Sequence, residues 1–293
     1  MKPANFEYYD PTTIEEAVDL LAHWGDQSRP LAGGQSLVPL MNFRLLRPAS
    51  LIDLNGVKNL SGLQVQNGEL RIGAMTRQRQ LEHSDDISNR WPLLRDAAGF
   101  IGHTQIRNRG TVGGSLAHAF PSAELPVAMV TLGASFVVRG KTAQRVVSAE
   151  EFFVTTMTTL LEPVELLTEI RVPKLADHTG WSYQEVSRRH GDFALGGAAA
   201  LVELDTRGNI GRARVTVTGV TPYRLMQTEN ALAGQKPSEA TIHDAVRLSI
   251  NELEQDSDIH ASAEYRKTVC EAMAQRALLT AIDRSAQSWR GNT

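Results

Sequence analysis

The chain has 293 residues, of which 42% are hydrophobic, and its formal net charge at pH 7 is −3. This composition excludes a disordered polymer, and the small charge gives no reason to expect nucleic acid or an anionic membrane as a partner. No apolar stretch reaches membrane-spanning length and Met1–Glu7 contains no apolar signal core, so we expect a cytoplasmic protein without an integral membrane segment.

The N-terminal segment, residues 1–56, predicts a small α/β unit. Thr13 and Glu16 form a capping-box pattern in front of a run whose apolar residues repeat at helical spacing. Short strands are predicted at Arg29–Ala32 and Leu51–Leu54. We therefore expect a strand, a glycine loop, a short helix and a second strand in this order.

Two loops with adjacent glycines lie far apart in the sequence. We call Leu31–Ser36 loop 1 and Thr111–Ser115 loop 2. Glycine lacks a β-carbon, so the main chain can approach an anion closely and consecutive amides can converge on phosphate oxygens. The hydroxyl groups of Ser36, Thr111 and Ser115 can add further donors. Two such loops could hold one diphosphate between them.

Other phosphate-binding patterns fit loop 1 less well. Asp53 follows Gly33 by about 20 residues, the distance at which a dinucleotide-binding βαβ unit keeps its ribose-binding acid. That fingerprint spreads three glycines over the turn, whereas Gly33 and Gly34 are adjacent and Pro39 interrupts any long helix. No Gly-Lys-Ser/Thr follows either glycine pair, which excludes a P-loop.

The middle of the chain, residues 57–174, predicts a mixed unit of strands and short helices. A helix with proline in its first turn is expected at Pro92–Ile101, leading the chain to loop 2. Strands are expected at Leu70–Met75, Ala134–Arg139 and Leu167–Pro173. Lys174–Gly180 is the expected linker.

The last part, residues 178–287, predicts a separate α+β unit. Three antiparallel strands are expected at Ser182–Ser187, Ala198–Leu204 and Ala213–Val220. Two helices follow, one opening near Ser238 and one over Ala263–Asp283. The single cysteine, Cys270, lies in the second helix and cannot form an internal disulfide or bind an iron–sulfur cluster alone, so we expect it to fill a small apolar place in the core.

Several long motifs, taken together, resemble one family. They are Pro30–Pro39, Arg47–Leu54, Ile101–His118, Ser187–Ala194 and Asp258–Arg266. They resemble the FAD-binding medium subunit of molybdenum hydroxylases, the family of xanthine dehydrogenase and carbon monoxide dehydrogenase. Because the motifs occur in the right order over nearly the whole chain, a chance match is improbable.

The resemblance implies a fold and a function. The fold is α+β: a two-part FAD-binding domain of the PCMH type, with an α/β part at 1–56 and a mixed part at 57–174, followed by a CO-dehydrogenase-flavoprotein-like domain at 178–287. The implied function is an electron-transfer subunit whose FAD receives electrons from [2Fe–2S] clusters on a small partner and passes them to an external acceptor. A large partner would hold the molybdopterin cofactor, in a dimer of heterotrimers.

The resemblance also implies which residues bind FAD. Glu124 would face the polar middle of the cofactor, and Ile101 and Leu161 would pack on the isoalloxazine ring. Without the resemblance, Glu124 would be interpreted as a surface charge and the two apolar residues as ordinary core. No residue is expected to be catalytic or to ligate metal. The expected diphosphate contacts are Leu31, Ala32, Gly33, Gly34, Gln35, Ser36, Thr111, Gly113, Gly114 and Ser115.

Two departures from the family pattern limit what can be transferred. Phe120 stands where relatives often have an aspartate, and Gln184 and Glu185 stand where they often have a lysine near the flavin. A negative Glu185 would repel the diphosphate of NAD, which favours a quinone, a cytochrome or another soluble carrier as acceptor. His118 is expected to be structural, and Asp192 to organise a strand end or a subunit contact.

Two other functions remain open at this point. One is a self-contained flavoprotein oxidase of the vanillyl-alcohol-oxidase-like type, which would need its own substrate domain and catalytic bases. The other is a scaffold that has kept the fold but lost FAD. The substrate of the complex is not encoded in this chain.

Overall fold

The computed structural model describes residues 1–290. The chain divides into two compact units, each built from separate stretches of sequence. Unit 1 contains residues 1–80, 103–119 and 134–173, and unit 2 contains residues 81–102, 120–133 and the chain from 174 onward. The helical segments 81–102 and 120–133 therefore group with the C-terminal residues, which the sequence did not indicate.

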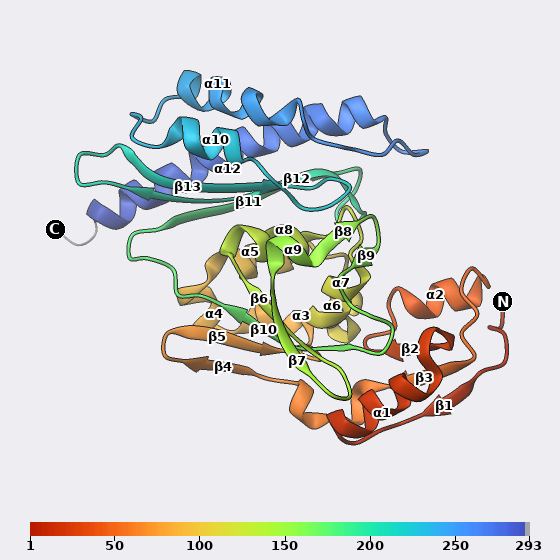
Figure 1. Cartoon of the computed structure of the whole chain (residues 1–293). Coiled ribbons are helices and arrows are strands. Elements are labelled where there is room, and N and C mark those ends of the chain that lie inside the picture. Colours follow the sequence, from red (N-terminus) through yellow and green to blue (C-terminus); the bar gives the residue numbers. More distant parts are fainter. Residues whose placement is uncertain (291–293) are drawn as a thin grey trace. The chain divides into compact units, whose positions relative to one another are not determined.

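Unit 1 begins with the predicted small α/β part (Figure 1). Thr13 and Glu16 form the complete capping box in front of the first helix, which buries Ala17 and Leu21 against Ile52. The three strands are parallel, in the order β1-β3-β2. The elements are β1 (Glu7–Tyr9), α1 (Ile14–Trp24), β2 (Ser28–Leu31), α2 (Leu37–Asn42) and β3 (Ser50–Asp53).

The rest of unit 1 is built on a five-stranded antiparallel sheet with the order β4-β5-β10-β6-β7. Alternate residues of β5 are buried, and Phe136 of β6 packs edge-on against Phe152 and Phe153. The strands are β4 (Leu63–Gln66), β5 (Glu69–Gly73), β6 (Ser135–Arg139), β7 (Gln144–Ser148) and β10 (Leu166–Val172). A small hairpin, β8 (Phe153–Thr155) with β9 (Thr158–Thr159), follows the short helix α9 (Ala149–Phe152).

Unit 1 also contains all or part of three short helices, the last of which includes loop 2. They are α3 (Gln78–His83), which begins in unit 1 and continues into unit 2, α6 (Thr104–Arg109) and α7 (Val112–His118). Loop 2 is thus the start of α7, with Thr111 as its N-cap residue. The sequence analysis treated this segment as an open loop because two adjacent glycines are unusual inside a helix.

Unit 2 contains the three predicted antiparallel strands and a fourth that is only two residues long. The order is β11-β12-β13-β14, so the sheet has four strands rather than three. Tyr223 pairs with Val217 and Arg224 with Thr216, a segment too short to give a strand pattern in the sequence. The strands are β11 (Gly180–Ser187), β12 (Ala194–Leu204), β13 (Ile210–Val217) and β14 (Tyr223–Arg224).

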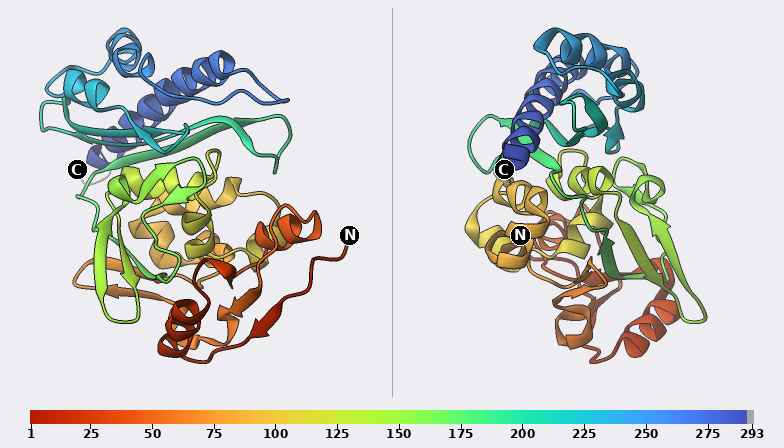
Figure 2. Two further views of the ribbon diagram at one scale, coloured as in Figure 1. Left: turned by 45° about the vertical axis from the view of Figure 1, so that its right-hand side comes forward. Right: turned by 90° about the vertical axis from the view of Figure 1, so that its left-hand side faces the viewer.

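Helices pack on the sheet of unit 2. The long helix α12 (Ala263–Arg290) contacts β11 and β12 and lies along the sheet in both further views (Figure 2). A β-carbon on Gly180 would overlap the main chain of α12 at Ala281, so this close approach requires glycine. The other helices of unit 2 are α4 (Asp85–Arg90), α5 (Pro92–Phe100), α8 (Glu124–Leu132), α10 (Met226–Leu232) and α11 (Glu239–Ile250).

The core of unit 2 is rich in small residues. Ala198 and Ala200 of β12 face Ala274 and Ala277 of α12 in one buried cluster, which also contains Cys270. The expected structural role of Cys270 is consistent with its complete burial. Within residues 1–290, no helix is both long and apolar enough to cross a membrane.

Candidate functional site

Loop 1 and loop 2 lie side by side within unit 1. A β-carbon on Gly33 would overlap the carbonyl oxygen of Arg109, the residue two before Thr111. A β-carbon on Gly114 would lie 3.5 Å from the β-carbon of Ala32. The fold therefore brings together the two segments that the sequence analysis paired on their composition alone.

Loop 1 presents a row of main-chain donors. Within residues 1–290, no protein group accepts a hydrogen bond from the amides of Gly33, Gly34, Gln35 and Ser36. Gly34 has φ +73°, in the left-handed region, and the side chain of Gln35 donates to the carbonyl oxygen of Gly33 at 3.2 Å. Successive amides around a left-handed residue form a concave anion site, so loop 1 fits a phosphate group.

The glycine amides of loop 2 donate hydrogen bonds within the protein, whereas we had expected them to be available to a phosphate. The amide of Gly113 donates to the carbonyl oxygen of Ala74 at 2.8 Å, and the amide of Gly114 donates to the Thr111 hydroxyl at 3.1 Å. A β-carbon on Gly113 would overlap Ala74, so this glycine is needed for packing. The glycines of loop 2 thus bring α7 close to its neighbours, and loop 1 holds the free donors.

Asp53, the residue that suggested a dinucleotide fold, is engaged within the protein. Its Oδ2 accepts from the Tyr8 hydroxyl at 2.5 Å and its Oδ1 accepts from the amide of Asn55 at 2.9 Å. Burial acts to raise the pKa of Asp53, but the hydrogen bonds from Tyr8 and Asn55 outweigh it and lower the pKa. The hydrogen bond to Asp53 raises the pKa of Tyr8 to about 12. Asp53 therefore stabilises the end of β3 as a carboxylate.

The three residues expected to contact the flavin beyond its diphosphate are divided between the units. Leu161 belongs to unit 1, where its amide donates to the Thr159 hydroxyl at 3.3 Å. Ile101 and Glu124 belong to unit 2, and each is only 8% exposed. Glu124 is the first residue of α8 and is not the exposed surface charge that an isolated glutamate would be. Their contacts with the cofactor stay predictions.

Glu185 bonds Tyr183 and lies within electrostatic reach of Glu124 inside unit 2. The Tyr183 hydroxyl donates to Oε2 of Glu185 at 3.2 Å. Burial, and then the nearby negative charge of Glu124, raise the pKa of Glu185 to about 8. Glu185 is therefore mostly neutral at pH 7, which removes the negative charge on which we had based the repulsion of NAD. Sequence reasoning missed Tyr183, although it shares a strand face with Glu185 by its spacing of two.

The other residues singled out in the sequence have structural surroundings. Phe120 packs against Phe193 with 4.5 Å between ring centroids, and Phe193 is 71% exposed. Burial lowers the pKa of His118, so this half-buried residue is neutral at pH 7. Asp192 lies 3.6 Å from Arg188 in the connection between β11 and β12.

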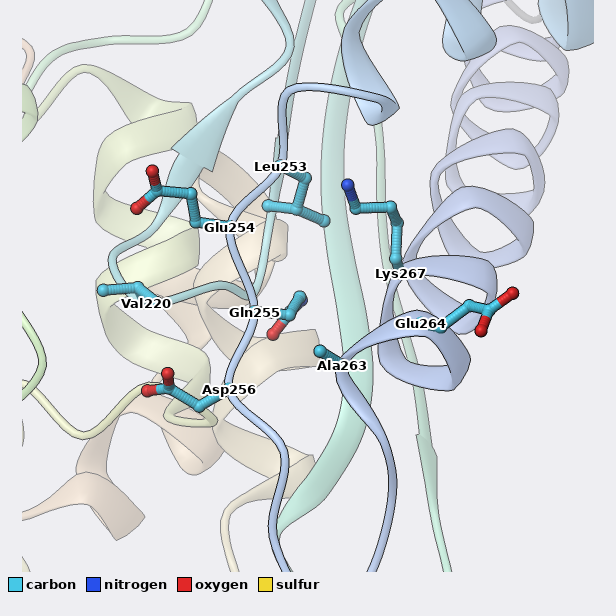
Figure 3. Close-up of a pocket in the computed structure, with 8 residues that line it drawn as sticks. All are labelled: Val220, Leu253, Glu254, Gln255, Asp256, Ala263, Glu264 and Lys267. Atoms are coloured by element: carbon cyan, nitrogen blue, oxygen red, sulfur yellow. The ribbon is translucent and has the colours of Figure 1, made fainter.

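A separate hollow of about 550 Å³ lies in unit 2 (Figure 3). Lys267 lies at its side, and its ammonium group donates to the carbonyl oxygen of Asn251 at 2.9 Å. The lining residues are Val220, Leu253, Glu254, Gln255, Asp256, Ala263, Glu264 and Lys267, none of them a predicted site residue. Among residues 1–290, no cluster of histidine, cysteine, aspartate and glutamate could hold a metal ion.

Two family models match the chain. The one described as FAD binding domain in molybdopterin dehydrogenase matches residues 4–175. The one described as CO dehydrogenase flavoprotein C-terminal domain matches residues 181–281. Together they cover both the loops of unit 1 and the four-stranded sheet of unit 2.

Individual relatives match over almost their full length. The chain is 42% identical to 6-hydroxypseudooxynicotine dehydrogenase complex subunit alpha of Paenarthrobacter nicotinovorans, over 97% of each chain. It is 36% identical to the carbon monoxide dehydrogenase medium chain of Hydrogenophaga pseudoflava, over 98% of this chain and 100% of that one. A solved structure of carbon monoxide dehydrogenase from Hydrogenophaga pseudoflava matches with a TM-score of 0.94 and 37% identity. The match covers 97% of this chain and 99% of that one, and the solved enzyme lacks the Mo-pyranopterin moiety of its molybdenum cofactor.

The fold and the two matched domains define a flavin-binding subunit of an oxidoreductase. More specifically, the chain belongs to the family of FAD-binding subunits of molybdenum hydroxylases, to which carbon monoxide dehydrogenase and xanthine dehydrogenase belong. It is the FAD-carrying electron-transfer subunit of a heteromeric dehydrogenase, and the alternatives of a self-contained oxidase and of a scaffold without FAD are not supported.

Proposed function

We propose that loop 1 and loop 2 of this subunit hold the diphosphate of FAD, with the amides of loop 1 as the main donors. The observation that carries this proposal is the row of four amides, Gly33 to Ser36, for which residues 1–290 contain no acceptor. Gly33 is buried, whereas Gly34, Gln35 and Ser36 are partly or fully exposed, so a phosphate group can reach this row of donors and accept from it. The hydroxyl of Ser115 lies in the first turn of α7 and can add one donor from loop 2.

When bound, FAD takes up electrons from one carrier and releases them to another. The part of this chain is to bind and orient the cofactor, since none of its residues is expected to act as an acid or base in the transfer. By resemblance, Ile101 and Leu161 pack on the ring system and Glu124 faces the polar middle of the cofactor. These three roles extend the proposal beyond the diphosphate.

Binding measurements on the full chain, freed of flavin, test the diphosphate site. FAD and ADP share the diphosphate, whereas riboflavin has none. We expect ADP to compete with FAD and riboflavin to bind at least about tenfold more weakly than FAD, a difference equal to about 1.4 kcal/mol. Equal affinities for riboflavin and FAD, with no competition by ADP, would overturn the placement of the diphosphate.

The proposed partners are a large subunit with a molybdopterin cofactor and a small subunit with two [2Fe–2S] clusters. Support comes from the relatives, one of which is named as a complex subunit and one as a medium chain. We further propose that two heterotrimers associate and that the complex is cytoplasmic. Native mass measurement after co-purification tests the assembly, and cell fractionation tests the location.

The proposed electron acceptor is a quinone, a cytochrome or another soluble carrier rather than NAD. The support is now only that Gln184 and Glu185 provide no cation at the position where relatives often have a lysine. Stopped-flow reoxidation of the reduced complex tests it. Reoxidation by NAD at a rate that matches turnover would contradict this part of the proposal.

A further inference from the structure

Asn55 and Arg77 connect the two glycine loops of unit 1 through side-chain hydrogen bonds. Asn55 lies in the short 3-10 turn Leu54–Gly56 after β3, and its Nδ2 donates to the carbonyl oxygen of Ala32 in loop 1 at 3.1 Å. Arg77 precedes α3, and its Nη2 donates to Oδ1 of Asn55 at 2.6 Å. Its Nη1 donates to the carbonyl oxygen of Arg109, just before loop 2. We call this chain of hydrogen bonds the loop clasp.

The main chain around Arg77 is already attached to loop 2. Arg77 pairs with Thr111 in an isolated β-bridge, and the amide of Val112 donates to the carbonyl oxygen of Thr76 at 2.9 Å. The guanidinium of Arg77 therefore starts from a segment whose position is fixed relative to loop 2. Its hydrogen bond to Asn55 joins this segment to the small α/β part that contains loop 1. Thus the clasp is a link between the two parts of the unit.

The charges around the clasp act on Arg77 in both directions. Asp53 is a carboxylate that orients Asn55 by accepting from both its amide and its Nδ2. Burial, and then the nearby charge of Arg109, lower the pKa of Arg77, and the negative charge of Asp53 offsets part of this effect. Arginine suits this place because its planar group can donate to two acceptors at fixed directions, which lysine cannot do.

We propose that Asn55 and Arg77 are positioning residues that hold loop 1 and loop 2 at the spacing in which both can contact the FAD diphosphate. This inference rests on the proposed function, because it takes the loops to be the diphosphate site. Asn55 bonds a carbonyl oxygen of loop 1, and Arg77 bonds one in the segment that leads into loop 2, so the amides of loop 1 stay available. The clasp thus acts on the ligand only through the loops.

The test compares Arg77→Lys with Arg79→Lys in the full chain, freed of flavin. Arg79 lies two residues further on and donates to the side chain of Asn108 at 2.9 Å, not to a loop carbonyl. We expect Arg77→Lys to raise the dissociation constants of FAD and ADP about tenfold or more, the effect of one charge-assisted hydrogen bond. Riboflavin affinity should be unchanged, since riboflavin has no diphosphate. Arg79→Lys should bind all three ligands like the wild type.

A second variant keeps the proposal testable if Arg77→Lys does not fold. Asn55→Ala should show the same selective loss, and the double variant should lose little more than either single variant, because the two residues act as one unit. Wild-type affinity for FAD and ADP in folded Arg77→Lys or Asn55→Ala would overturn the clasp. Equal weakening of riboflavin would also overturn it, since that would indicate general loosening. If ADP fails to compete with FAD in the wild type, the proposed function fails instead.

Discussion

The main chains of Gly33 and Arg109 lie so close that a β-carbon on Gly33 would overlap the carbonyl oxygen of Arg109. This contact sets the distance between loop 1 and the segment that leads into loop 2. Gly33 does not have a positive φ, so glycine is not needed here for its backbone conformation. It is needed because a side chain would occupy the space taken by the main chain of Arg109. The contact can therefore be tested without straining the backbone.

Gly33→Ala should weaken FAD binding by pushing the two loops apart. We expect the dissociation constant to rise at least about tenfold, since one methyl group must displace main-chain atoms. Gly99→Ala is the matched control, because its β-carbon would have no atom within 4 Å. Isothermal titration of FAD into both variants measures the effect, and equal affinities would contradict the prediction.

Gly114→Val should remove most of the bound FAD while leaving the fold largely intact. A β-carbon at this position would lie 2.6 Å from the Thr111 hydroxyl, which caps α7. Losing such a cap costs about 0.5–2 kcal/mol of helix stability. Flavin released by acid from the purified variant gives the stoichiometry. Ala117→Val, at an exposed position of the same helix, should keep full stoichiometry.

Glu185→Gln should flatten the pH dependence of stability. The pKa of Glu185 is about 8 in the fold and near 4.5 in the unfolded chain, so between these values the native state holds a proton that the unfolded state has released. The free energy of unfolding therefore falls as pH rises through this window, by at most about 1.4 kcal/mol per pH unit, and solvent screening reduces this value. Urea midpoints from pH 5 to 8.5 measure this. A parallel decline in both proteins would count against a protonated Glu185.

Cys270 should not react with thiol reagents in the native protein. Its side chain is fully buried, and its sulfur lies 3.4 Å from the Thr218 hydroxyl. Burial raises the pKa of the thiol, so little of the reactive thiolate forms at neutral pH. We expect one thiol to react in urea and none without it. Rapid labelling of the folded protein would show that α12 opens from the sheet.

The isolated subunit should bind FAD but oxidise no organic substrate. It has one cysteine, and residues 1–290 contain no cluster of metal-binding side chains, so it lacks the centres that react with substrate. In the purified complex, chemical reduction of the clusters should be followed by bleaching of FAD. Bleaching of FAD by substrate in the rigorously isolated subunit would disprove this division of labour.

The capping box at Thr13 and Glu16 shows which parts of the fold were predictable. A capping box, an alternating strand or an apolar helix face depends on residues a few positions apart, so the sequence contains the whole signal. The two-residue strand β14 and the helical start of loop 2 were not predicted, because each depends on a partner segment. The pairing of Tyr223 with Val217 and the contact of Gly113 with Ala74 are such cases.

The sequence by itself determined the family, FAD as its cofactor and the presence of two glycine loops, because these follow from residue types and their order. Only the tertiary structure decided that loop 1 keeps its amides free while loop 2 uses its own, and that Asn55 and Arg77 join the two. It also decided that Glu185 is mostly neutral at pH 7, since burial and the neighbouring Glu124 raise its pKa. Hydrogen-bond partners and desolvation depend on residues that are distant in the chain, and only folding brings these together.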